Sequence, residues 1–107
     1  MNTNPSAQLD ALGDATRRAI LARLVRQGPL AVGELASEFP ISRPAISQHL
    51  RVLKRANLVT DHSEGARRLY AVNPDALAAL RGYFEQFWTE ALAGFKRRAE
   101  ANPKKKR

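Results

Sequence analysis

Apolar residues in the first part of the chain recur at the spacing of helices. Leu9 and Leu12, three positions apart, predict a short helix with one apolar edge. Asp14 is a suitable N-cap for a longer helix, and the Gly-Pro pair at 28–29 is a typical helix end. Between them the apolar positions keep a helical period; they are Ala19, Ile20, Leu21, Leu24 and Val25.

Two further helices are predicted before the middle of the chain. The first runs from about Val32 to Phe39 and is broken by the following Pro-Ile pair. The second has Ser42 as its N-cap, tolerates a proline in its first turn, and continues to about Ala56. Residues spaced about 100° apart separate its two faces. The apolar face holds Ala45, Ile46, His49, Leu50, Val52, Leu53 and Ala56.

The opposite face of the Ser42–Ala56 helix is the strongest candidate for a functional surface. It carries Arg43, Pro44, Ser47, Gln48, Arg51, Lys54 and Arg55, which include four cations and no acid. A face that only confers solubility usually mixes both signs of charge. We therefore expect this face to meet a polyanion.

The periodicity changes after Asn57. The runs 58–60 and 69–72 are rich in β-formers and predict two strands joined by a turn around Ser63-Glu64-Gly65. Arg67 and Arg68 would flank the tip of this hairpin. The predicted fold is mainly α with a small β-hairpin, in the order α-α-α-α-β-β-α.

Asn73-Pro74-Asp75 is a strong helix start, and the predicted last helix continues to about Ala99, on the order of 40 Å. Five of the seven aromatic residues lie between Tyr83 and Phe95. One small domain cannot cover such a stripe, so a second subunit is expected on it. The alternative is an apolar pocket between subunits for a small-molecule effector. The residues expected at the dimer interface are Leu9, Leu12, Leu80, Phe84, Phe87, Trp88, Ala91 and Phe95.

Composition limits the remaining classes of function. The 107 residues allow one domain over 7–100, preceded by a flexible lead over 1–6 and followed by a basic, disordered tail over 101–107. The net charge of +8, half of it from the last four residues, favours a polyanionic partner, and charge alone leaves nucleic acid and a membrane surface both open. No apolar run is long enough to cross a membrane, so we expect a cytoplasmic protein associated with the nucleoid and not with a membrane.

Several stretches of the chain together resemble the arsenical-resistance-repressor (ArsR/SmtB) family of winged helix-turn-helix regulators. They are Ala11–Arg18, Val32–Ala36, Ser42–Leu50, Val52-Leu53 and Leu58-Val59. The resemblance implies a repressor that binds double-stranded DNA as a homodimer, through its first and last helices, on an inverted repeat. It also implies that the Ser42–Ala56 helix enters the major groove, and that Arg67 and Arg68 serve the wing. The expected contacts of that helix are Ser42, Arg43, Pro44, Ser47, Gln48, His49, Arg51 and Lys54.

The chain departs from the metal-sensing members of this family. Ala31 and Gly33 stand where those members carry thiolates, the chain contains no cysteine, and the last helix contains no histidine. We therefore expect no metal site and no cofactor, because soft metals need thiolate or imidazole ligands. His49 and His62 alone make neither a metal site nor a catalytic set, so the protein is not expected to be an enzyme. A non-specific architectural nucleic-acid binder and a protein-interaction module remain as alternative functions.

Overall fold

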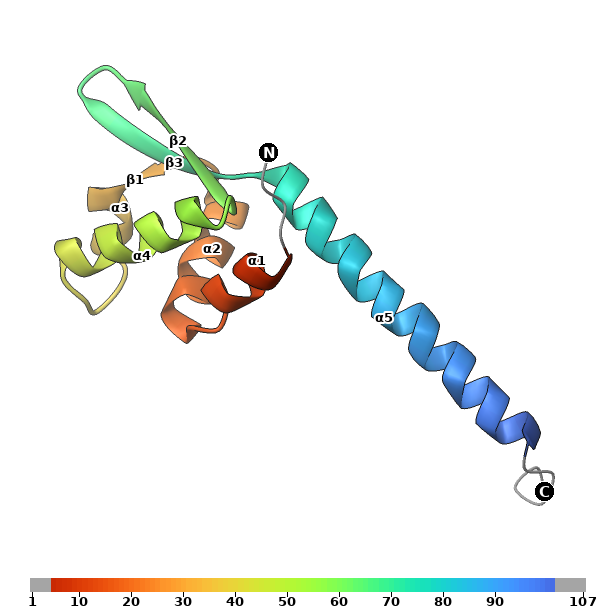
Figure 1. The fold of residues 1–107 in the computed structure, drawn as a ribbon. Coiled ribbons are helices and arrows are strands. Elements are labelled where there is room, and N and C mark those ends of the chain that lie inside the picture. Colours follow the sequence, from red (N-terminus) through yellow and green to blue (C-terminus); the bar gives the residue numbers. More distant parts are fainter. Residues whose placement is uncertain (1–4, 102–107) are drawn as a thin grey trace.

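The computed structural model describes residues 5–101. These residues form five helices and a three-stranded antiparallel sheet. Figure 1 shows α1 to α4 gathered into a compact body, from which the β2–β3 hairpin projects in one direction and α5 in another. The predicted winged helix-turn-helix fold is confirmed. In chain order the elements are α1 (Pro5–Ala11), α2 (Ala15–Gln27), β1 (Leu30–Ala31), α3 (Val32–Ala36), α4 (Arg43–Arg55), β2 (Val59–Glu64), β3 (Arg67–Val72) and α5 (Pro74–Ala101).

Side-chain caps begin three of the helices where the sequence predicts them. The Asp14 carboxylate accepts a hydrogen bond from the backbone N–H of Arg17 (2.9 Å), at the start of α2. The Ser42 hydroxyl accepts one from the N–H of Ala45 (3.2 Å), at the start of α4. Before α5, the Asn73 side-chain oxygen accepts from the N–H of the second residue after it (3.1 Å). Each bond satisfies a donor that the first turn of a helix leaves without a partner.

Strand β1 is an element that the sequence analysis missed. Its two residues pair antiparallel with β3, in the register Leu30↔Tyr70 and Ala31↔Leu69, so the sheet order is β1-β3-β2. Two residues are too few to show an alternating pattern, and only the partner strand makes them a strand. The hairpin strands are also longer than predicted, because cross-strand pairing extends to Glu64↔Arg67 at the tip.

Three helix boundaries differ from the predicted ones. Helix α3 ends at Ala36 and does not reach Phe39; beyond its last residue, the Ser37 hydroxyl donates to the backbone oxygen of Glu34 (2.8 Å), a local bond that competes with helix continuation. Pro5 and Ser6 lie in the first turn of α1, where a proline needs no N–H partner. At the other end Ala101, predicted as the first residue of a basic tail over 101–107, is the last residue of α5. The rest of that predicted tail, residues 102–107, lies outside the described residues, as do residues 1–4.

The core lies between α4, α2, α3 and the start of the hairpin. The α4 residues Ile46, Leu50 and Leu53 are completely buried, which confirms the predicted apolar face of this helix. They belong to one cluster of buried residues with Leu24, Leu35, Leu58 and others on neighbouring elements. This packing holds α4 against the body and leaves its opposite face at the surface.

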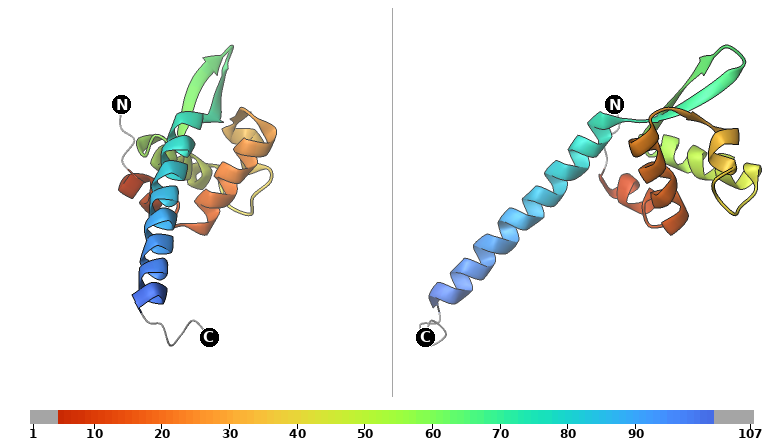
Figure 2. Two further views of the ribbon diagram at one scale, coloured as in Figure 1. Left: turned by 90° about the vertical axis from the view of Figure 1, so that its right-hand side faces the viewer. Right: turned by 180° about the vertical axis from the view of Figure 1, so that it is seen from behind.

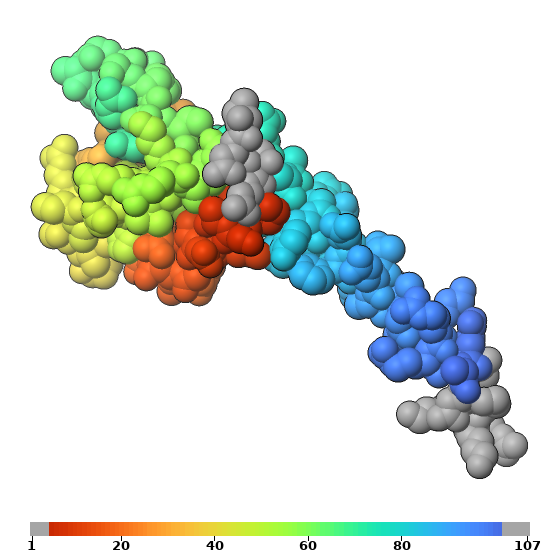
Figure 3. Space-filling view, viewed as in Figure 1, coloured from red at the N-terminus to blue at the C-terminus, as the bar shows by residue number. Residues whose placement is uncertain are grey.

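Helix α5 is anchored only near its start. Ala76 and Leu80 are buried in the protomer core, whereas the helix beyond Tyr83 projects away from the body (Figures 2 and 3). Leu80, expected at a dimer interface, is therefore used by the protomer itself, and Leu9 and Leu12 pack partly buried against the same core. The exposed large apolar residues of the projecting part are Phe84, Phe87, Trp88, Leu92 and Phe95.

Candidate nucleic-acid interface

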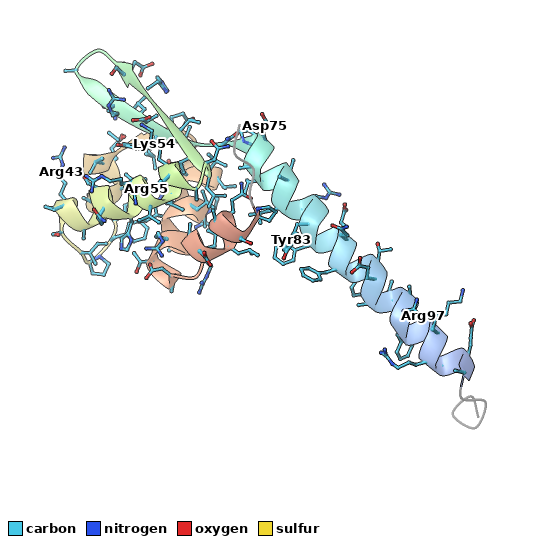
Figure 4. The ribbon with its side chains drawn as sticks, viewed as in Figure 1. Arg43, Lys54, Arg55, Asp75, Tyr83 and Arg97 are labelled. Atoms are coloured by element: carbon cyan, nitrogen blue, oxygen red, sulfur yellow. The ribbon has the colours of Figure 1, made fainter. Side chains whose placement is uncertain are left out.

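The exposed face of α4 holds the polar side chains that the sequence analysis placed there. Arg43, Gln48, Arg51 and Lys54 are exposed, and Ser47 is half-buried between them and the core face. Figure 4 shows Arg43 at the start of the helix and Lys54 near its end, on the side of the hairpin. The side-chain oxygen of Gln48 accepts a hydrogen bond from Arg51, one turn further along. The helix thus presents hydrogen-bonding groups of both kinds and cations over its full length.

His49 is set apart from that face. It is half-buried and turned towards α2, where its Nδ1 lies 3.5 Å from Nη1 of Arg17. Arg17 also donates through Nε to the backbone oxygen of Ala11 (2.7 Å), and so ties the α1–α2 turn to α4. Only the packing of α2 against α4 reveals this bridging position of Arg17.

The wing arginines are both held by carboxylates from other elements. Arg67 lies 2.6 Å from Glu34 of α3, whose side chain also accepts the backbone N–H of Ala31 (2.8 Å). Arg68 lies 2.9 Å from Asp61 of β2. The other carboxylate oxygen of Asp61 lies 2.8 Å from Nζ of Lys54 on α4. Helix and wing are therefore connected through ion pairs.

These contacts lower the pKa of both carboxyl groups. For Asp61 the main cause is its bond to Lys54, assisted by Arg68. For Glu34 the main cause is the backbone N–H of Ala31, assisted by the charge of Arg67. Both groups are therefore ionised at neutral pH, and the basic surface contains two fixed negative charges.

Asp61 and Glu34 are the functional candidates that sequence reasoning missed. The helix face taken alone is free of acids, as predicted, but the two carboxylates reach it from β2 and α3. For Asp61 the sequence offered part of a signal, because residues 59, 61 and 63 of a strand must share one face. The register adds that residues 68, 70 and 72 lie on the same face, which places Asp61 close to Arg68. Nothing in the linear pattern connects Glu34 to a wing residue 33 positions away.

An open groove of about 520 Å³ lies between the start of α4 and the wing. Arg43 borders it from α4, packed over Gly33, where an added Cβ would lie 3.7 Å from the guanidinium. Arg67 and Arg68 border it from β3, with Glu34 as the one acid in the lining. A groove with three cations and one acid suits a backbone phosphate. Its complete lining is Ala31, Val32, Gly33, Glu34, Arg43, Ala66, Arg67 and Arg68.

Metal-binding clusters and membrane-spanning helices are both absent from residues 5–101. This part of the chain holds no group of three or more histidine, aspartate or glutamate side chains arranged to bind a metal ion. Nor does it include a helix with the length and apolar character needed to cross a membrane.

Helix α4 packs on two other helices, exposes a face with cations and an amide, and is followed by a hairpin that carries two arginines. This arrangement defines a winged helix-turn-helix DNA-binding protein. Comparison with known proteins leads to the same class of protein. The family described as a helix-turn-helix domain matches residues 12–62, which span α2 to the first half of the hairpin. The chain is 56% identical over 92 residues to the HTH-type transcriptional regulator Rv2034 of Mycobacterium tuberculosis, covering 86% of this chain and 85% of that protein.

Two further similarities narrow the class, and the second of them identifies the family. The transcriptional repressor SdpR of Bacillus subtilis is 42% identical over 67 residues, which cover 63% of this chain and 73% of that protein. The solved structure of an ArsR-like transcriptional regulator from Rhodococcus sp. RHA1 is 31% identical, with a TM-score of 0.75 over 89% of this chain and 92% of the other. The chain belongs to the ArsR family of transcriptional regulators. It is a sequence-specific DNA-binding regulator, and the members of this family are not enzymes.

Proposed function

We propose that the protein is a repressor that acts as a homodimer and blocks transcription by occupying an inverted-repeat operator. The observation that carries this proposal is the exposed face of α4, where Ser47, Gln48 and the cations lie beside the arginines of the wing. A helix is the right width for the major groove, where the four base pairs can be distinguished. Repression is supported by the relative SdpR, which is named a transcriptional repressor.

The α4 side chains divide by chemistry into base readers and phosphate binders. Gln48 can donate to and accept from adenine at once, and Ser47 can make a less selective hydrogen bond. Arg43, at the start of the helix and on the edge of the groove, is placed to bind a phosphate. Arg51 can reach either a base edge or the backbone. Ser42 and Pro44 lie in the first turn, which is the part of such a helix that approaches DNA most closely.

His49 has a different place in the proposed surface. Its ring is half-buried against Arg17, so any phosphate contact would be made from the edge of the surface rather than from its centre. Arg67 and Arg68 extend the surface beyond the helix, and we assign them to the DNA backbone next to the half-site.

The homodimer is supported by the uncovered apolar face of α5. Phe84, Phe87, Trp88 and Phe95 are each at least half exposed, and Ala91 lies between them on the same face. Exposed apolar patches of this kind mark interfaces. A two-fold dimer built on α5, with α1 beside it, would present two α4 helices to the two half-sites of a palindrome. The same face could enclose a small apolar effector between the subunits.

The chain contains no cysteine, so we propose that it does not sense metals through thiolates. Release from DNA would then depend on another signal, for which an apolar effector at the α5 face is the candidate that this chain's own side chains support.

A titration onto DNA tests the proposed function directly. The purified protein is added to a labelled fragment from upstream of its own gene and to a scrambled fragment, at about physiological salt. We expect the specific fragment to bind about a thousandfold more tightly, with two protected half-sites about one helical turn apart. Equal binding to both fragments, followed by no preferred sequence in a selection from random duplexes, would replace this proposal by the non-specific architectural binder.

A further inference from the structure

Asp61 of β2 joins α4 to the wing through its ion pairs with Lys54 and Arg68, within the proposed DNA-binding surface. We propose that Asp61 determines specificity: it holds Lys54 of α4 and Arg68 of β3 on one carboxylate, and its charge suppresses sequence-independent binding. This inference rests on the proposed function, because it takes α4 and the wing as the surface that meets DNA.

The geometry of Asp61 is that of a brace between two elements. Its side chain is 9% exposed, whereas those of Lys54 and Arg68 are 54% and 53% exposed. One carboxylate oxygen lies 2.8 Å from Lys54 and the other 2.9 Å from Arg68, so each cation has its own oxygen. Arg68 is held further by Ser63, whose hydroxyl lies 3.2 Å from its other terminal nitrogen. The cations face solvent at a fixed spacing, with the acid behind them.

A role in stability alone does not account for this acid. Because both cations are about half exposed, the two ion pairs of Asp61 add to stability only modestly. A carboxylate next to a polyanion weakens binding, and a surface selected only for affinity would leave both cations free. Asp61 therefore lowers the affinity for DNA, and the property that it can improve is specificity, the ratio of operator binding to random binding.

The gain in specificity follows from how each kind of binding uses charge. Binding to random DNA depends almost entirely on the number of phosphates that free cations neutralise. The trio of Lys54, Arg68 and Asp61 carries one net positive charge in place of two, which weakens this non-specific term. Base reading by α4 requires its cations and the wing to be at the correct spacing, which the brace maintains. Asp61 thus lowers binding to random DNA more than binding to the operator.

The test is Asp61→Asn, which keeps the shape of the side chain and removes its charge. Binding is measured by fluorescence anisotropy from about 50 to 300 mM NaCl, on a random duplex and on the tightest duplex recovered by selection. We expect the plot of log Kobs against log salt to steepen by about 0.9 on the random duplex, the value for one additional neutralised phosphate. We also expect the ratio of selected to random affinity to fall at least about threefold.

Glu64→Gln is the matched control. Glu64 lies at the exposed end of the same strand and makes no ion pair within the described residues, so the substitution changes the net charge equally without releasing a cation. It should steepen the slope by less than half as much and leave the affinity ratio unchanged. An unchanged slope or an unchanged ratio in Asp61→Asn, or equal effects of the two variants, would overturn the assignment.

Two further comparisons keep the test decisive. If Asp61→Asn does not fold, Lys54→Gln takes its place: it leaves the trio with no net charge and removes the ion pair between α4 and β2. It should flatten the slope on the random duplex by about 0.9 and, because the brace is lost, also lower the ratio of selected to random affinity. An unchanged affinity ratio in Lys54→Gln would overturn the assignment. Failure of the proposed function itself is distinguishable, because the wild-type protein would then show no preferred duplex at all.

Discussion

Replacement of Trp88 by alanine gives a quantitative test of the proposed dimer. Trp88 lies on the projecting part of α5 and is 66% exposed, the largest value among the exposed large apolar residues. It contributes nothing to the buried core of the protomer. The substitution should therefore leave the protomer folded and act on whatever covers the α5 face.

The expected magnitude follows from the area that Trp88 still exposes. A large aromatic side chain buries up to about 250 Å², so about 165 Å² of Trp88 is available to a partner. At about 25 cal/mol/Å² its complete coverage would stabilise the dimer by about 4 kcal/mol per protomer. If the partner covers only half of that area, each Trp88 contributes about 2 kcal/mol, and the two subunits together contribute about 4 kcal/mol to the dimer. Because each 1.4 kcal/mol is about a factor of ten, the dimer Kd should rise roughly a thousandfold.

Sedimentation equilibrium over nanomolar to micromolar protein measures this change, and circular dichroism checks that the helices persist. Gln86→Ala is the control, because Gln86 is also exposed on α5 and lies about 200° around the helix from Trp88. It should leave the Kd within about a factor of three. Equal Kd values for the two variants, or a wild-type protein that is monomeric and folded at micromolar concentration, would refute the proposed dimer.

Three more predictions concern α4 and the carboxylates. Gln48→Ala should reduce discrimination at one base pair by about 1–3 kcal/mol, measured by competition between single-base operator variants; an equal loss on random DNA would contradict base reading. Ser42→Ala should lower the free energy of unfolding in urea by about 1 kcal/mol, and Ser42→Gly by only a few tenths, because glycine is also a good N-cap; an unchanged midpoint for the alanine variant would contradict the cap. The pKa values of Asp14, Glu34 and Asp61 are lowered in the folded protein, so their stabilisation is complete above their ordinary values, near pH 4, and is lost as the pH falls through the folded values. Urea titrations from pH 6 to pH 2.5 should show this loss, and a smaller loss in Asp61→Asn; stability that rises as the pH falls would contradict it.

The local elements of this protein could be predicted from its sequence because their causes are local. Asp14, Ser42 and Asn73 cap helices whose first turns lie within three residues of them, and a side chain that bonds its neighbours needs no distant partner. The two faces of α4 follow in the same way from the helical period, which separates Ile46, Leu50 and Leu53 from the exposed residues without reference to any other element. The candidate base-reading face was predictable for this reason.

Other features depend on contacts that only the folded chain makes. Strand β1 exists because β3 lies beside it, and two residues carry no period of their own. Along α5 the same apolar stripe divides into a buried part at Leu80 and an exposed part from Phe84 onwards, since the body of the protein ends there. No spacing along the helix marks that boundary.

The charges at the candidate DNA-binding surface show most clearly which features the sequence determines and which need the tertiary structure. The sequence by itself determined that α4 has a basic face free of acids and that two arginines follow on the hairpin. Tertiary structure alone decided that Glu34 and Asp61 meet those arginines, because these ion pairs join α3 to β3 and β2 to both α4 and β3. Charge acts through space at a few ångströms, and the distances between elements are set by the packing of the core, which a linear pattern does not contain.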